Sequence, residues 1–73
     1  MEFIISCNFI AFDNEVSRTI AVDQFLCVRY VTVASITQFR ETFPKIIQIM
    51  QEEAKEKYPN KTIIMVSQNI TKL

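Results

Sequence analysis

The pattern of apolar and polar positions is clearest between Thr42 and Pro59, where apolar residues recur every three or four positions. This spacing predicts an α-helix with one apolar side and one charged side. Lys55 and Lys57 fall in its last turn, where the negative end of the helix dipole favours cations. Pro59 and Asn60 end the helix, because Pro cannot continue it and Asn tolerates left-handed geometry. The predicted apolar stripe consists of Ile46, Ile47, Met50, Ala54 and Tyr58, widened by Ile49.

The helical region begins before this stripe. Ser35 and Gln38 fit the capping-box pattern, and Thr37 is an alternative N-cap. Pro44 then lies inside one continuous helix, or it divides a short helical turn from the main helix. An interior Pro costs about 3 kcal/mol through a steric clash and a lost hydrogen bond. We therefore expect a kink or break near residues 42–43.

The stretch from Phe3 to Phe12 alternates in the manner of a β-strand. One face is wholly apolar and is predicted to pack on the helix, because one amphipathic helix cannot bury its own stripe. The other face is mixed. The apolar face consists of Phe3, Ile5, Cys7, Phe9 and Ala11, and the mixed face of Ile4, Ser6, Asn8, Ile10 and Phe12.

The segment from Asp13 to Arg18 is predicted to be a connecting turn, since Asp and Asn tolerate turn geometry. The alternative is a short helix capped by Asn14 that runs through Val16 and Ile20. The β-branched residues that follow favour the turn.

Two apolar runs between Thr19 and Val33 both favour strand. Asp23 and Gln24 interrupt them, either as a bulge in one long strand or as a turn between two strands. In the first case the two N-terminal strands form a long hairpin, and parity is consistent with one register without proving it. That register pairs Cys7 with Cys27, Phe9 with Phe25, Ile5 with Arg29 and Phe3 with Val31.

The segment from Lys61 to Leu73 is predicted to be the last strand. Residues 62–66 are apolar on both faces, which is typical of an interior position in a sheet. Residues 67–73 are more polar, and we expect a frayed end. The 73 residues therefore predict one small α+β domain: two or three strands, a helix and a final strand. The sheet is mainly antiparallel, and the helix packs on one face.

Composition adds a reason to expect a partner. Hydrophobic residues make up 49% of the chain, yet a domain this small buries only roughly 60–65% of the surface that its unfolded chain exposes. Some apolar surface should stay outside. Eight basic and eight acidic residues cancel, so nucleic-acid binding is disfavoured. No apolar run is long enough to span a membrane and the N-terminus does not resemble a signal peptide, so we expect a cytoplasmic protein.

The chain contains no Gly and no His. The first absence excludes Gly-rich phosphate loops, and the second removes the commonest general base and metal ligand. We therefore expect no catalytic residue, cofactor, metal or small-molecule substrate. Cys7 and Cys27 are interpreted as small buried hydrophobes, the alternative being a disulfide or redox pair. The remaining acidic cluster, Glu52, Glu53 and Glu56, is interpreted as a solvated helix face with a Glu53–Lys57 pair.

These observations favour a protein-binding module without catalysis. One form of this hypothesis is an inhibitor that binds and blocks a larger protein, as small accessory proteins of phages and mobile elements do. The alternatives are a structural homodimer without a foreign partner and, less favoured, a nucleic-acid-associated accessory protein. Arg and aromatic residues are enriched at protein interfaces, and the candidate interaction surface consists of Ile10, Phe12, Phe25, Arg29 and Tyr30.

Overall fold

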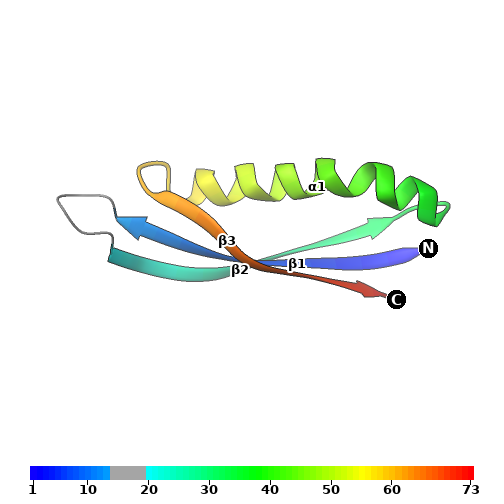
Figure 1. Cartoon of the computed structure of the whole chain (residues 1–73), viewed down its shortest axis with the longest axis horizontal. Helices are drawn as coiled ribbons and strands as arrows, with labels where there is room; N and C mark the ends of the chain where they lie inside the picture. The colour runs from blue at the N-terminus through cyan, green and yellow to red at the C-terminus, as the bar shows by residue number, and fades with distance from the viewer. Residues whose placement is uncertain (14–19) are drawn as a thin grey trace.

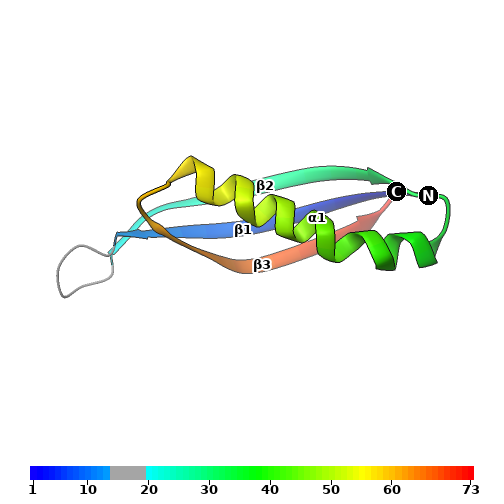
Figure 2. The same ribbon diagram turned by 90° about the horizontal axis from the view of Figure 1, so that it is seen from above.

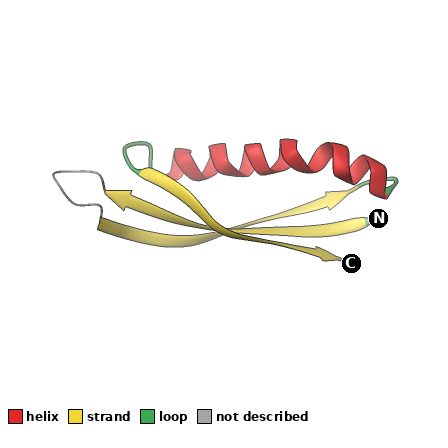
Figure 3. Cartoon of the chain, viewed as in Figure 1, coloured by secondary structure: helices red, strands yellow, loops and turns green. Residues whose placement is uncertain are grey.

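The computed structural model describes residues 1–13 and 20–73. Its elements are β1 (Glu2–Asp13), β2 (Ile20–Thr32), α1 (Ile36–Lys57) and β3 (Thr62–Lys72). The strands form one antiparallel sheet in the order β2-β1-β3, and α1 lies across one face of it (Figures 1 and 3). The predicted α+β class and the strand–strand–helix–strand order are confirmed. Residues 14–18 of the predicted turn, and most of the alternative short helix, lie outside the described residues, and Asp13 is the last residue of β1.

The first two strands form the predicted long hairpin. Cys7 lies opposite Cys27, and the pairs of Phe9 with Phe25, Ile5 with Arg29 and Phe3 with Val31 are all present. The register shifts between Ala11 and Phe12, whose partners are Asp23 and Ala21. One residue of β2, Val22, therefore has no opposite residue, which is the mark of a β-bulge. The interruption at Asp23 is thus a bulge in one strand and not a turn between two.

The position of the last strand differs from its prediction. β3 lies at an edge of the sheet, and β1 is the interior strand. The hairpin already occupies one side of β1, so the chain returning from α1 can pair only with the other side. The expected frayed end is also wrong, because β3 pairs with β1 as far as Lys72 and the Leu73 amide donates to the Glu2 carbonyl at 2.9 Å. These hydrogen bonds hold a polar segment that has little apolar surface to bury.

The start of α1 follows the predicted capping box. Ser35 is the N-cap, and its hydroxyl accepts a hydrogen bond from the Gln38 amide at 3.1 Å. The Gln38 side chain accepts in turn from the Ala34 amide at 2.6 Å. The Ser35 hydroxyl thereby satisfies a donor that the helix itself leaves without a partner, whereas the Gln38 side chain bonds the amide before the N-cap, one position earlier than in the usual capping box. The alternative cap, Thr37, is not used.

The helix is continuous through Pro44, so the expected break is absent. Pro44 has no N–H to offer to the Arg40 carbonyl one turn earlier. In Figure 1 the first turns of α1 bend toward the sheet, as is usual when Pro interrupts the hydrogen-bond ladder. The Thr42 hydroxyl donates to the Gln38 carbonyl at 2.7 Å, a backbone contact that also favours bending.

The core lies between α1 and the face of β1 that was predicted to be apolar. All five predicted residues of that face are buried. The helix adds Phe39, Ile46, Met50 and Ala54. Ile47 and Tyr58 are partly buried, but Ile49 is 42% exposed and does not widen the stripe as predicted. It lies one position away from Met50 and therefore turns about 100° away from the sheet.

Candidate functional site

The sheet face opposite α1 is left uncovered by the described part of the chain (Figures 1 and 2). We call it the outer face. Cross-strand partners share a face, so the register defines its members. Its apolar members are Ile4, Ile10 and Phe12 of β1, Leu26, Val28 and Tyr30 of β2, and Ile64 of β3. Its polar members are Glu2, Ser6, Asn8, Gln24, Thr32, Thr62, Ser67, Asn69 and Thr71.

The apolar members gather along β2 and at the end of the sheet near the hairpin turn. Leu26 is 57% exposed, Val28 52% and Tyr30 73%. Val22 and Val66, the extra residues at the two bulges, are also exposed. Toward the other half of β3 the surface becomes polar, and the Asn8 amide donates to the Ser67 hydroxyl at 3.2 Å. An apolar sheet face of this extent is the usual sign of an interaction surface in a small protein.

The structure divides the five predicted interface residues between two faces. Ile10, Phe12 and Tyr30 lie on the outer face, whereas Phe25 and Arg29 lie on the helix side. The prediction of one joint surface is therefore wrong, because neighbours in a strand point to opposite faces. Sequence reasoning also left Ile64 out, since β3 was expected inside the sheet. The alternation along β3 could have identified it.

Phe25 and Arg29 instead connect β2 to the second half of α1. The Phe25 ring stacks on Phe9, with centroids 5.6 Å apart, and lies 5.8 Å from the Tyr58 ring. The Lys57 ammonium lies 4.4 Å from the centroid of Phe25. Arg29 forms an ion pair with Glu53. The predicted Glu53–Lys57 pair is therefore replaced by contacts that both residues make with the sheet.

Asp23 is a further residue of β2 that contacts the C-terminal end of α1. It accepts a hydrogen bond from the Tyr58 hydroxyl and lies 3.9 Å from the Lys57 ammonium. The hydrogen bond from Tyr58 is the main cause that lowers the pKa of the Asp23 carboxyl, and the backbone amide of Gln24 and the charge of Lys57 add to it. The same hydrogen bond raises the pKa of the Tyr58 hydroxyl. These contacts join the C-terminal end of α1 to β2.

The two thiols face each other in the hairpin and are free. Cys7 is fully buried, and its sulfur lies 4.0 Å from the Met50 sulfur. Cys27 is only half-buried. Burial raises the pKa of both thiols, and the neighbouring Cys27 thiol adds to the effect on Cys7. A raised pKa leaves less of the reactive thiolate at neutral pH. The buried position predicted for both thiols is found for Cys7, whereas Cys27 is partly exposed.

Residues 1–13 and 20–73 contain no group of three or more His, Cys, Asp or Glu side chains arranged for a metal ion. In the same ranges no helix has the length and apolar character needed to cross a membrane. Within the acidic cluster, Glu52 accepts a hydrogen bond from the Gln48 amide at 3.4 Å, and Glu53 is paired with Arg29. Glu52 and Glu53 thus have separate partners.

Comparison of the chain with protein-family models, curated proteins and solved structures finds no match.

Proposed function

We propose that this protein is a non-catalytic module that binds another protein through the outer face of its sheet. One observation carries the proposal: large apolar side chains of all three strands lie together on a face that the single helix does not reach. In water such a surface is costly to leave exposed, and covering it stabilises the complex by about 25 cal/mol per Å² of apolar area removed from water. Occupying the surface of a larger protein is also how such a module would act as an inhibitor.

The electrostatics of the outer face support a protein partner over a nucleic acid. From Ile4 to Phe12 and across to their partners in β2 and β3, the outward positions carry no charged side chain. A phosphate backbone would require Lys or Arg there. Asn8 and Ser67 offer hydrogen-bonding groups beside the apolar residues, a mixture typical of protein interfaces. We retain a cytoplasmic location within this proposal, since two opposed free thiols suit a reducing compartment.

A second copy of this chain is the other candidate partner. A two-fold interface brings each surface against itself, so the uncharged stretch from Ile4 to Phe12 avoids like-charge repulsion. β1 contains 12 residues, which gives the three-stranded face a length of roughly 40 Å, a width of about 14 Å and a projected area on the order of 560 Å². Because side chains project from the sheet, the accessible area of this face is larger than its projected area. It therefore approaches the roughly 800 Å² per partner that a standard interface buries.

Capture from native lysate with matched variants tests the proposal. Wild-type protein should retain a stoichiometric foreign protein, identified by mass spectrometry, and Leu26→Lys should lose it. The control is Ile49→Lys, which places the same charge at an exposed apolar residue on the opposite side of the molecule. Recovery of the chain alone would favour the homodimer. Equal capture by Leu26→Lys and wild type would exclude the outer face as the binding surface.

A further inference from the structure

The edge of β3 that faces away from β1 is a second exposed feature of the sheet, separate from the outer face. Within the described part of the chain, no strand pairs with this edge. Residues 62–71 contain no charged residue, no Pro and no Gly. The opposite edge, on β2, carries Asp23 and Arg29, and both are bonded to α1. β3 therefore lacks the charges and prolines that usually prevent an edge from pairing with another strand.

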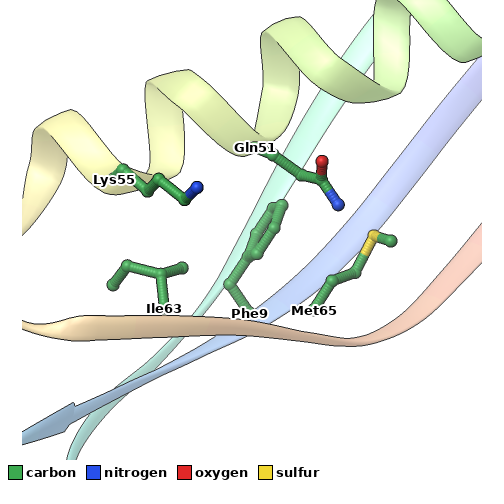
Figure 4. A pocket seen from close by; sticks show the side chains of 5 residues that line it. All are labelled: Phe9, Gln51, Lys55, Ile63 and Met65. Atoms are coloured by element: carbon green, nitrogen blue, oxygen red, sulfur yellow. The ribbon is translucent and has the colours of Figure 1, made fainter.

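A pocket lies directly inside this edge, between α1 and β3 (Figure 4). Its volume is about 140 Å³, and it is lined by Phe9, Gln51, Lys55, Ile63 and Met65. This volume is close to that of the roughly 150 Å³ apolar cavity that accepts benzene in a well-studied protein. The buried Phe9 ring stands in the middle, with Ile63 and Met65 of β3 beside it (Figure 4). One apolar side chain of a partner would fit here.

The rim of the pocket is polar and cationic. Figure 4 shows the Lys55 ammonium and the Gln51 amide on either side of the Phe9 ring, both on α1 above β3. The ion pairs found in residues 1–13 and 20–73 involve Arg29, Lys57 and Lys61 and leave Lys55 without one. A carboxylate of a bound segment would therefore meet an available positive charge and an amide donor.

We propose that the β3 edge binds an extended acidic peptide segment of another protein as a fourth strand, with one apolar side chain in this pocket and a carboxylate at Lys55. Main-chain hydrogen bonds to β3 would supply affinity, and the pocket would select the side chain. In a strand, residues two apart share a face. The recognised segment therefore has an apolar residue and an Asp or Glu two positions away. This site is separate from the outer face, because the pocket lies on the helix side of the sheet.

Selection from a random peptide library displayed on phage, with peptides of about ten residues to span a strand, tests the proposal. Selection should enrich an apolar residue and an acidic residue two positions apart. The most enriched peptide is then synthesised and titrated into isotope-labelled protein, and binding is followed by NMR. The amide chemical shifts that change on peptide addition should be those of residues Thr62 to Asn69. An analogue N-methylated at alternate residues should not bind, because methylation removes the N–H donors of the hydrogen bonds between peptide and β3.

Two variants test the pocket. Lys55→Glu should weaken the peptide by roughly tenfold, since it replaces attraction with repulsion at the rim, and Gln51→Trp should abolish binding by filling the pocket. Lys45→Glu, an equal charge change at an exposed position earlier on α1, is the control and should bind like wild type.

Several results would overturn the proposal: no enrichment over background, equal binding of the N-methylated analogue, or shifts confined to Leu26, Val28 and Tyr30. A dimer that forms through the β3 edges of two copies in the absence of peptide would also overturn the proposal, because the occupant of the edge would then be a second copy of this chain. Leu26→Lys should leave peptide binding unchanged, so the edge site and the outer face can fail independently of each other.

Discussion

Met50 is the side chain around which the contact between α1 and the sheet is built. It is 1% exposed and touches the Cys7 sulfur at the centre of β1. Met50→Ala should lower the free energy of unfolding by about 2–5 kcal/mol, because it leaves a cavity in the core. Met50→Lys should prevent folding, since it buries an unpaired charge. Urea denaturation followed by circular dichroism measures both effects.

Ile49 provides the matched control for this prediction. It is the adjacent residue but is largely exposed, so Ile49→Ala should change stability by less than about 0.5 kcal/mol. Wild-type stability of Met50→Lys would mean that α1 presents a different side to the sheet.

The hydrogen bond between Tyr58 and Asp23 gives the protein a pH dependence that can be measured at one residue. It lowers the pKa of the Asp23 carboxyl in the folded state, so the folded protein binds fewer protons there than the unfolded chain. The resulting stability is present above the ordinary Asp pKa of about 3.9 and is lost as the pH falls through the lower folded value. Tyr58→Phe should return the Asp23 pKa toward its ordinary value, as followed by NMR titration. An unchanged pKa in that variant would assign the shift to the Gln24 backbone amide and the Lys57 charge instead.

At the scale of the element, the cap of α1 can be tested with two neighbouring hydroxyls. Ser35 accepts from the Gln38 amide, while Thr37, the alternative N-cap, does not cap the helix. Ser35→Ala should therefore cost about 1 kcal/mol of stability. Thr37→Ala should cost little and serves as the control. A larger loss for Thr37→Ala than for Ser35→Ala in thermal unfolding would place the start of the helix at Thr37.

Pro44 offers the opposite kind of test, because it stabilises neither the helix nor a contact in the core. It is exposed, and an interior Pro is about 3 kcal/mol less favourable in a helix than Ala. Pro44→Ala should raise the unfolding free energy by about 1–3 kcal/mol, measured in urea, with Lys45→Ala as a neutral control. A loss of stability would mean that the bend is needed to bring Phe39 onto Phe3, whose rings stack at 4.1 Å.

The sequence was most informative where the apolar and polar positions followed a single period. Period-two alternation identified the buried face of β1. Parity was consistent with the observed pairing of Cys7 with Cys27, because a slip of one residue would have exposed that face, but a slip of two residues would have kept it buried. It was least informative about strand order. The apolar run of β3 resembles that of an interior strand, but pairing depends on which side of β1 is free, and no local pattern records that.

At the scale of the whole molecule, one helix and three strands make a two-layer structure with one open side. The sequence predicted that apolar surface would remain outside, and it placed Ile10, Phe12 and Tyr30 correctly on the uncovered face. It could not predict the pocket beside Lys55, because residues of α1, β1 and β3 line it together. Such a gap depends on where one layer lies over the other.

The open side leads to the last prediction, that the purified protein self-associates at micromolar concentration when no partner is present. Two outer faces brought together would bury apolar residues of β2, with no charge in the paired region to oppose contact. Light scattering after size exclusion should give a dimer for wild type and for Ile49→Lys, and a monomer for Leu26→Lys, which places a charge at the centre of the interface. A wild-type monomer that binds a hydrophobic dye would contradict self-association and would reserve the outer face for a foreign protein. A wild-type monomer that binds no dye would mean that the face is already covered within the chain, against the register of β1 with β2.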